Sequence, residues 1–462
     1  MWPFGNADMI PKNGVEFLEL MVDLSKTYGE VSTFWLGPRP LVFVTSPTIT
    51  KELISKDPDS FEKGDAYNNL KPWLGSSILL SEGEHWRHKR TVLGRAFRLA
   101  HLKAFAPIFS YSTARLVALL DGRLDGAAAA AAGSGRSGLE VDPLDLMTRV
   151  TQDIIGLSAF GFDFHAVPSW PLRDPRCNHY HTLTQLMDSR DRSMLLSLMP
   201  NALYLLTPPG RVFKQSVEGL ALEARQIIER RLSGEQPERP DLLSFMIEPD
   251  PDTEQQVMLS AQELVEEVNL FIFAGHETTS STLTWALYFL AQHPDIMRRV
   301  RDEIDAIGGV EALSDYDSSS KLKTLTNVVK ETLRLATPTI AFVRQPTVEL
   351  EAQEYRFPAG VPIVFASHGC HMNPNYWPDP HRFDPDRFTP ENSKGRHPFA
   401  WTPFAVGARN CIGQPFALLE SRVVLAMLVH AYDWEVVSPP VKQVFLLLRP
   451  VDAKMRITRR QR

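Results

Sequence analysis

An apolar helical pattern from Ser260 to His293 constrains the fold of this chain more than any other feature of its sequence. Ser260 and Glu263 have the spacing of a capping box at its start, and Pro294 marks its end. At about 1.5 Å per residue, a helix of about 33 residues is roughly 50 Å long, which is the width of a whole domain. Its middle, residues 270–274, is entirely apolar, so we expect it to be buried in a large, mainly helical fold.

Other segments predict the elements around this helix. Residues 31–46 predict a β-hairpin, Pro47–Ser55 predicts a helix, and Gly83 opens another amphipathic helix. Short alternating runs with Pro and Gly over residues 343–365 predict small strands. Residues 374–388, rich in Pro, Asp and aromatic side chains, predict an ordered irregular loop. The expected fold class is therefore mainly α, with small β-sheets.

The composition is that of a globular protein with enough apolar material for a large core. Of 462 residues, 44% are hydrophobic and 23% are charged, and the net charge of −6 gives no support to nucleic-acid binding. Three cysteines without a CxxC pair argue against a disulfide framework or a zinc site. We interpret residues 1–462 as a single domain in which residues 121–138, rich in Ala, Gly and Ser, form a low-complexity surface insertion. A linker between two domains is the alternative for this segment.

A turn around Cys411 carries the clearest chemical signal. Gly407 and Gly413 flank this cysteine and allow the backbone to turn sharply and to approach a flat ring closely. An apolar helical pattern begins at Pro415, and its N-terminus directs N–H groups toward the sulfur, which favours a thiolate. Arg409 is placed to meet a carboxylate. A lone cysteine is most often a small buried apolar side chain, but haem iron accepts a cysteine thiolate as its axial ligand.

Polar residues interrupt the apolar middle of the long helix. Glu277 and Thr278 follow Ala274 at spacings of three and four residues, so the three side chains share one face. Gly275 lowers helix propensity here and leaves room beside the backbone. By itself the pattern has two equally good explanations. One is a helix kink in which a hydroxyl side chain bonds a carbonyl of the preceding turn, and the other is a functional site. We expect His276 to make a structural hydrogen bond.

The cysteine turn resembles the haem-binding signature of the cytochrome P450 superfamily. The stretch from Phe404 to Gly413 fills all the key positions of that signature. The resemblance implies a cytochrome P450 fold with haem b (iron protoporphyrin IX), Cys411 as the axial ligand of the iron, and Phe404 packed beside the sulfur. It also implies that Arg409 contacts a haem propionate.

Residues 274–279 are similar to the oxygen-binding segment of the same superfamily. The resemblance implies that Thr278 hydrogen-bonds the bound oxygen and that Glu277 belongs to the proton-delivery route. Delivery of a proton to oxygen is general acid catalysis, here through a relay of hydroxyl groups and water.

Further contacts to the haem propionates are implied by similarity to the family. Trp86 and Arg90 have the spacing of the helix that reaches the propionates, and Arg344 resembles a third contact. An indole N–H and a guanidinium are both suited to a carboxylate. Three basic residues beside them are expected on a solvated face able to meet an acidic reductase: Arg87, His88 and Lys89.

Glu331 and Arg334 form an ion pair at helical spacing, which is a weak signal alone. Similarity to the family joins them to Arg387 in a structural network that braces the loop leading to the cysteine. Asp386 replaces the Glu often seen in that loop, without touching the network.

The chain is most similar to the fatty-acid ω-hydroxylase clan, family 4. Residues 34–38, 71–75 and 410–417 look like landmarks of that clan. Several of its members carry a Glu that forms an ester with the haem, and here the position is Ala274. We therefore expect a haem held noncovalently apart from the bond between Cys411 and iron.

The relation to a membrane is predicted from the ends and the middle of the chain. No stretch of about 18 apolar residues exists, and Met1–Asn6 resembles the segment that follows the anchor and hinge of microsomal relatives. We expect a missing anchor and the cytoplasmic face of the endoplasmic reticulum membrane, with a soluble form as the alternative. Residues 191–210 are either a core helix or the lid of a substrate channel that dips into the membrane.

The function that the resemblance implies is a monooxygenase. We expect it to insert one oxygen atom of O2 into a C–H bond of an apolar substrate. The expected substrate is a fatty acid or related lipid, with a sterol or xenobiotic as the alternative. No flavin or nicotinamide domain fits in the chain, so electrons come from an external partner, in the microsomal case NADPH–cytochrome P450 reductase. A haem-thiolate isomerase or dehydratase and a non-enzymatic haem sensor are further alternatives, and Thr278 and Glu277 argue against both.

Overall fold

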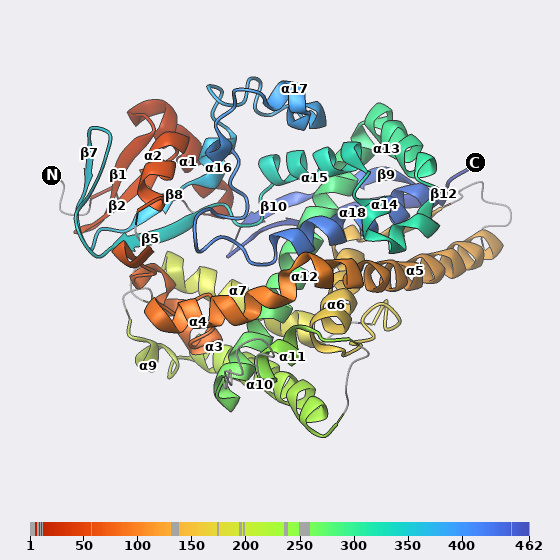
Figure 1. The fold of residues 1–462 in the computed structure, drawn as a ribbon, viewed down its shortest axis with the longest axis horizontal. Helices are drawn as coiled ribbons and strands as arrows, with labels where there is room; N and C mark the ends of the chain where they lie inside the picture. Colours follow the sequence, from red (N-terminus) through yellow and green to blue (C-terminus); the bar gives the residue numbers. More distant parts are fainter. Residues whose placement is uncertain are drawn as a thin grey trace.

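The structure is a computed structural model, and it describes residues 5–6, 9, 11, 13–56, 58–130, 138–172, 175–193, 196, 199–234, 239–248, 259–444 and 446–461. Helices make up most of it, and small sheets lie mainly toward one side, next to the N-terminal end of the chain (Figure 1). The predicted fold class is confirmed, because the molecule is mainly helical with small β-sheets.

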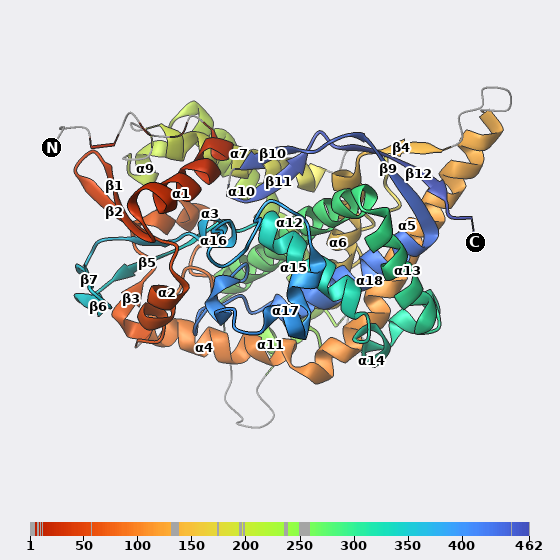
Figure 2. The same cartoon turned by 90° about the horizontal axis from the view of Figure 1, so that it is seen from above.

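The α-helices of the described residues are α1 (Gly14–Tyr28), α2 (Pro47–Ile54), α3 (Lys71–Leu74), α4 (Gly83–Gly94), α5 (Leu99–Ala130), α6 (Pro143–Phe160), α7 (Pro175–Arg192), α9 (Asn201–Tyr204), α10 (Pro208–Leu232), α11 (Leu242–Ile247), α12 (Ala261–Gln292), α13 (Pro294–Ala306), α14 (Tyr316–Ser319), α15 (Lys323–Leu335), α16 (Ser367–His371), α17 (Pro390–Ser393) and α18 (Gln414–Ala431). The helix expected from Ser260 is α12, and it begins with the predicted capping box between Ser260 and Glu263. It packs against α6, α10, α15 and α18 and crosses the middle of the molecule (Figures 1 and 2).

The strands are β1 (Val31–Leu36), β2 (Arg39–Val44), β3 (Phe61–Glu62), β4 (Leu139–Val141), β5 (Phe342–Pro346), β6 (Leu350–Ala352), β7 (Tyr355–Phe357), β8 (Ile363–Phe365), β9 (Tyr432–Ser438), β10 (Val441–Val444), β11 (Leu448–Val451) and β12 (Lys454–Arg459). The largest sheet has the order β1-β2-β8-β5-β3, in which β2 and β8 are parallel and the other pairs antiparallel. A second sheet has the order β4-β12-β9, and two hairpins pair β6 with β7 and β10 with β11. The predicted hairpin at residues 31–46 and the strands at residues 343–365 are confirmed.

The segment interpreted as a surface insertion differs in part from that prediction. Its first ten residues, 121–130, continue α5, which projects from the body of the molecule in Figure 2. Asp121 and Asp125 bind Arg459 of β12 through its Nε at 3.0 Å and its terminal nitrogen at 2.6 Å. Alanine favours helix strongly, so the Ala run extends the preceding helix instead of forming a loop. Residues 131–137 lie outside the described residues.

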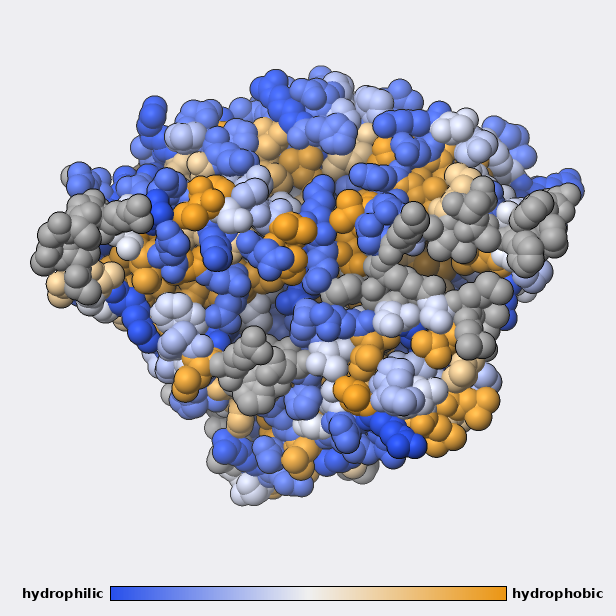
Figure 3. All heavy atoms as spheres, turned by 180° about the vertical axis from the view of Figure 1, so that it is seen from behind, coloured by the Kyte–Doolittle hydropathy of each residue, from blue (hydrophilic) through white to orange (hydrophobic). Residues whose placement is uncertain are grey.

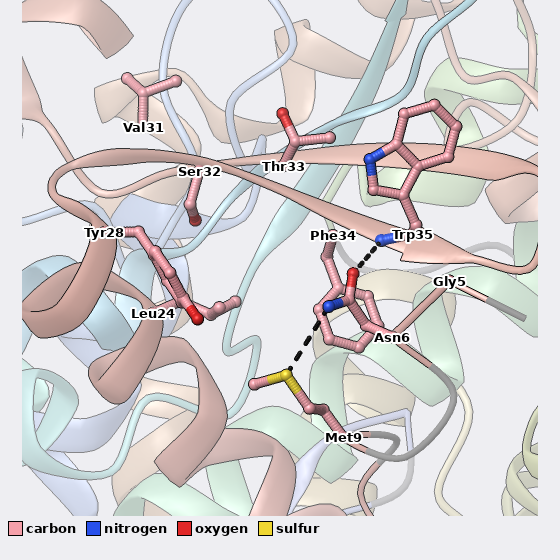
Figure 4. A pocket seen from close by; sticks show the side chains of 10 residues that line it. All are labelled: Gly5, Asn6, Met9, Leu24, Tyr28, Val31, Ser32, Thr33, Phe34 and Trp35. Carbon is pink, nitrogen blue, oxygen red and sulfur yellow. Dashed lines mark hydrogen bonds between the residues drawn. The ribbon is translucent and has the colours of Figure 1, made fainter. Parts of the chain in front are cut away.

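The molecule is hollowed in more than one place. A pocket of about 440 Å³ lies between α1 and β1, where Asn6 accepts a hydrogen bond from the Trp35 N–H at 2.9 Å (Figure 4). It is lined by residues of the N-terminal third of the chain, and it shares none of them with the cysteine turn. The chemical site is described next from its own residues.

Candidate functional site

The cysteine turn is shaped by two backbone hydrogen bonds and one obligatory glycine. The Cys411 N–H donates to the Phe404 carbonyl at 2.9 Å, and the Asn410 N–H donates to the Gly407 carbonyl at 3.1 Å. Gly407 has a φ of +79°, and a Cβ there would lie 2.2 Å from Cγ2 of Ile54. Only glycine meets both conditions, so this sequence folds the loop tightly and presents the cysteine at its end.

The N-terminus of α18 surrounds the sulfur with positive charge. Burial among protein atoms raises the pKa of the Cys411 thiol, whereas the N–H groups of Gly413 and Gln414 and the charge of Arg90 lower it. Cys411 is nevertheless accessible to solvent. The net effect leaves the pKa of the Cys411 thiol above its ordinary value, so a metal cation that binds this sulfur would have to displace its proton.

Arg90 of α4 lies at the cysteine turn. Its two terminal nitrogens donate to the carbonyl oxygen of Asn410 at 2.8 Å and to the Asn410 side-chain oxygen at 2.6 Å. The sequence places Arg90 with the propionate contacts, and in the structure its terminal nitrogens bind the residue that precedes Cys411. Its guanidinium fixes the orientation of the turn and adds positive charge near the sulfur.

The middle of α12 is also accessible to solvent. Ala274 is exposed and Thr278 is half-buried, although the helix is buried on either side of them. The Thr278 hydroxyl donates to the Ala274 carbonyl at 2.7 Å. One turn earlier, Phe271 stacks on Phe97 with their ring centroids 6.1 Å apart. Phe97 also lies 4.0 Å from the position of a Cβ on Gly413, so it connects α12 to the cysteine turn.

Glu277 is held by Arg449 and by its neighbour His276 on the buried side of α12. Its Oε2 lies 3.3 Å from Nε of Arg449 on β11, and its Oε1 lies 3.5 Å from Nε2 of His276. Although burial raises the pKa of this carboxyl, Arg449 and His276 lower it to about 2. The expected structural hydrogen bond of His276 is confirmed, because its Nδ1 lies 2.6 Å from the Ile272 carbonyl oxygen.

Three cations from distant parts of the chain meet at one edge of the site. Lys63 follows β3, Arg344 lies on β5, and Arg409 precedes the cysteine turn. Lys63 and Arg344 are only 8% and 5% exposed. The Arg409 guanidinium lies 4.2 Å from the centroid of the Trp86 ring. The structure therefore brings together the predicted Trp86, Arg344 and Arg409 and adds Lys63, which belongs to no motif in the sequence.

Burial and mutual repulsion destabilise the charge of this cluster. Burial and the charge of Arg344 lower the pKa of Arg409 to about 10. Burial, Arg344 and Arg409 lower the pKa of Lys63 well below its ordinary value. Burial also lowers the pKa of Arg344. Glu82 is the carboxylate that opposes the shift in all three groups. Asp59 also acts on Arg409 but is paired with Arg87. The cluster therefore has more cations than carboxylates, and such an electropositive recess suits an anion.

The predicted solvated basic face on α4 is wrong for Lys89. Its side chain is fully buried, donates to the Ser76 carbonyl at 2.7 Å and lies 3.1 Å from Glu267 and 3.2 Å from Glu263. Arg87 is partly exposed but is paired with Asp59 and Glu84. Lys89 is thus held in internal ion pairs because α12 presents Glu263 and Glu267 to α4, whereas His88 is exposed as predicted.

Glu331, Arg334 and Arg387 lie together, beside the loop that leads to the cysteine. Arg334 binds Glu331 through two nitrogens at 2.7 and 2.8 Å, and Nε of Arg387 lies 3.4 Å from the same carboxylate. Arg334 also donates to the carbonyls of His371 and Pro380 at 3.0 and 2.7 Å. These bonds tie α15 to an otherwise irregular segment.

An accessible cysteine at a helix N-terminus beside a recess of buried basic side chains suits a flat, anionic prosthetic group. The family profile for cytochrome P450 matches residues 1–456. Over 447 residues the chain is 29% identical to cytochrome P450 4V2 of Rattus norvegicus, which covers 93% of this chain and 82% of the relative. Over 477 residues it is 32% identical to cytochrome P450 4F12 of Homo sapiens, with coverages of 97% and 86%.

Solved structures agree with these relatives. The crystal structure of the cytochrome P450DA heme domain superposes with a TM-score of 0.81 at 25% identity, and covers 97% of this chain and 93% of that chain. The chain belongs to the cytochrome P450 family and is a cytochrome P450 monooxygenase, with family 4 members among its relatives. The predicted family is thereby confirmed.

The residues of the site fit a haem. An accessible sulfur at a helix N-terminus supplies an axial ligand. The exposed Ala274 leaves room for a ring beside α12. The recess with Lys63, Arg344 and Arg409 offers more positive charge than the protein itself neutralises, as the two propionates of a haem require.

Proposed function

We propose that this protein inserts one oxygen atom of O2 into a C–H bond of a fatty acid or related lipid. The observation that carries the proposal is the accessible Cys411 just before α18, which Phe97 connects to the exposed middle of α12. The lipid class is supported by the family 4 relatives at about 30% identity.

When bound, haem b supplies the chemistry of oxygen activation, and Cys411 is the residue that holds its iron. The N–H groups of Gly413 and Gln414 and the charge of Arg90 stabilise the sulfur as an anion. Phe404 belongs to the same turn through its carbonyl bond to the Cys411 N–H. Ala274 offers no carboxyl group for an ester, so the ring is held there by packing alone.

Thr278 is the residue that delivers protons to the oxygen. Its hydroxyl donates to the Ala274 carbonyl at 2.7 Å, and because the side chain is half-buried it also remains accessible. A hydroxyl in this position both donates and accepts, so it passes a proton without carrying charge. Glu277 is the next acid along the helix, and the ion pair with Arg449 must open before that carboxylate takes up a proton.

An external flavoprotein, NADPH–cytochrome P450 reductase, supplies the two electrons. The protein works at the cytoplasmic face of the endoplasmic reticulum membrane. None of the described helices has the length and apolar character needed to cross a bilayer. Peripheral contact is supported by exposed apolar side chains on α9, on the start of α10 and in the turn between them, among them Leu203, Val212 and Leu206. Apolar atoms gather at the lower right of Figure 3, on the side where α9 lies.

A sequence of measurements tests this function. The reduced protein with carbon monoxide is expected to give the absorption band of a thiolate-ligated haem, and a band typical of a neutral ligand would refute the role of Cys411. NADPH consumption with added reductase is then measured over a panel of fatty acids, sterols and xenobiotics, with product analysis by mass spectrometry. Hydroxylated fatty acids are the expected products; turnover of sterols or xenobiotics alone would overturn the lipid class.

A further inference from the structure

Glu277 is a buried carboxylate with a cation beside it but no hydrogen bond to that cation. Arg449 Nε lies 3.3 Å from its Oε2, yet in the described part of the chain neither atom has a hydrogen-bond partner. His276 Nε2 lies 3.5 Å from its Oε1 and is also without a partner among the described residues. Buried polar atoms are usually hydrogen-bonded, so this gap between a guanidinium and a carboxylate calls for an explanation.

The hydrogen bond of the Arg449 side chain goes instead to helix α7. Its Nη1 lies 3.0 Å from Nδ1 of His181. A guanidinium only donates, so Nδ1 accepts and carries no proton. The proton of the ring is then on Nε2, which lies 2.8 Å from the side-chain nitrogen of Gln185, and a half-turn of that amide places its oxygen there as the acceptor. His181 is therefore neutral in this arrangement.

His181 and Glu277 compete for the same guanidinium. Arginine binds a carboxylate best through two parallel N–H bonds. In the structure one terminal nitrogen of Arg449 is engaged with His181, on a different helix, and its Nε meets Glu277 by charge alone. The carboxylate is thus left without the two bonds that an Arg449 side chain released from His181 would give it.

We propose that His181 is a positioning residue for proton delivery: it accepts a hydrogen bond from Arg449 and so keeps the guanidinium from closing on Glu277. The inference rests on the proposed function, in which Glu277 supplies protons to Thr278. A carboxylate that a guanidinium binds at two points has both oxygens occupied and holds its negative charge more strongly. It therefore takes up a proton less readily. Through His181, helix α7 sets how readily Glu277 is protonated.

The protonation state of His181 makes this arrangement depend on pH. The charged groups that act on it are Arg449 of β11 and Glu277 of α12. Burial and Arg449 lower the pKa of His181, Glu277 raises it, and the net change is a lowering. Below that pKa both ring nitrogens carry protons, so the ring cannot accept from Arg449 and repels it. The hydrogen bond is therefore present near neutral pH and is lost as pH falls below the ordinary histidine value of about 6.5, and product formation should fall with it.

The experiment measures product formed per NADPH consumed, in water and in D2O, from about pH 5.5 to about pH 8. It uses the haem-loaded protein with reductase and a fatty acid that wild type hydroxylates. His181→Phe removes the acceptor, and the ratio should fall by roughly tenfold with a larger D2O effect, because proton supply becomes limiting. His181→Asn offers a neutral oxygen at every pH, so it should recover most of this loss and lack the decline on the acid side.

Removal of Arg449 distinguishes positioning from general disruption. In His181→Phe combined with Arg449→Met, no guanidinium is left to close on Glu277, so the ratio should exceed that of His181→Phe alone. Two merely structural losses would instead lower the ratio further. Combination with Arg449→Lys is a second test, because an ammonium group cannot bind a carboxylate as a planar fork. Circular dichroism and the carbon monoxide spectrum establish that each variant is folded and loaded with haem.

The control and the outcomes separate this inference from the proposed function. His179 lies on the same helix, but its ring faces Gly219 of α10, so His179→Phe should behave as wild type. An equal loss in His179→Phe would mean that α7 acts through packing alone. Wild-type coupling in His181→Phe, or double variants no better than His181→Phe, would also overturn the inference. If wild type itself forms no hydroxylated fatty acid, the proposed function is wrong and this inference falls with it.

Discussion

Arg90 donates two hydrogen bonds to Asn410, at 2.8 and 2.6 Å, and thereby fixes the residue next to Cys411. A guanidinium bound at two points sets orientation as well as distance. The cysteine turn is thus held from α4 by Arg90 and internally by the bonds of Phe404 and Gly407. Its geometry exists before a cofactor arrives, which limits the reorganisation needed for binding.

The first prediction concerns the sulfur. Cys411→Ser should lose the thiolate spectrum of the reduced, carbon monoxide-bound protein, because an alcohol remains neutral at this position. Cys370→Ser is the matched control: Cys370 is buried, and its sulfur lies 3.6 Å from the Ala400 carbonyl, in a different cluster. That variant should keep the spectrum. A thiolate spectrum in Cys411→Ser would refute the ligand assignment.

Thr278→Ala should keep the thiolate spectrum but divert electrons to peroxide. The hydroxyl that relays the proton is lost, and productive turnover should fall by up to about 100-fold. The measurement is the ratio of product to NADPH consumed, together with released peroxide. Thr284→Ala removes a hydroxyl with the same kind of bond, to the Ser280 carbonyl at 2.8 Å, and should remain coupled. Tight coupling in Thr278→Ala would contradict the relay.

Acid extraction with organic solvent should release free haem from the protein. Ala274 provides no carboxylate for an ester, so the cofactor depends on the sulfur and on noncovalent contacts. Haem that stays with the polypeptide after denaturation, measured by mass spectrometry of the intact chain, would show a covalent link elsewhere.

Glu331→Gln should destabilise the segment that leads to the cysteine. The substitution leaves Arg334 and Arg387 near a neutral amide in a buried place, and removal of one partner of such a network costs about 3–5 kcal/mol. Urea unfolding measures the loss. Asp386→Asn is the control, because its pair with Arg299 is surface-exposed and contributes little. An equal loss in both variants would contradict the structural role.

The sequence predicted the long helix and the cysteine turn of this molecule better than the partners of its buried charged side chains. The capping box and the apolar middle of α12 are local sequence signals, and so are the glycines around Cys411. The helix and the turn could therefore be predicted without the structure. The partners of Lys89 and Lys63 could not. Lys89 lies in a basic run that is typical of solvent-exposed helices, and its carboxylates Glu263 and Glu267 are far away in sequence. Burial of a charge depends on tertiary neighbours, which residue type does not encode.

The last prediction follows from the ion pair between Arg449 and Glu277. The pKa of Glu277 is lowered from 4.5 to about 2 in the fold, so its ionised form contributes stability above about pH 4.5 that is lost as pH falls toward 2.

In Arg449→Met the carboxylate stays buried without its cation, and we expect a loss of about 3–5 kcal/mol near pH 7. The pKa of Glu277 then rises, because burial is no longer opposed, and the carboxyl is protonated on mild acidification. The deficit measured by urea unfolding should therefore shrink between about pH 7 and about pH 5. Arg449→Lys keeps the charge and should show a smaller deficit with little pH dependence. A deficit in Arg449→Met that is the same at both pH values would mean that the pair contributes packing alone.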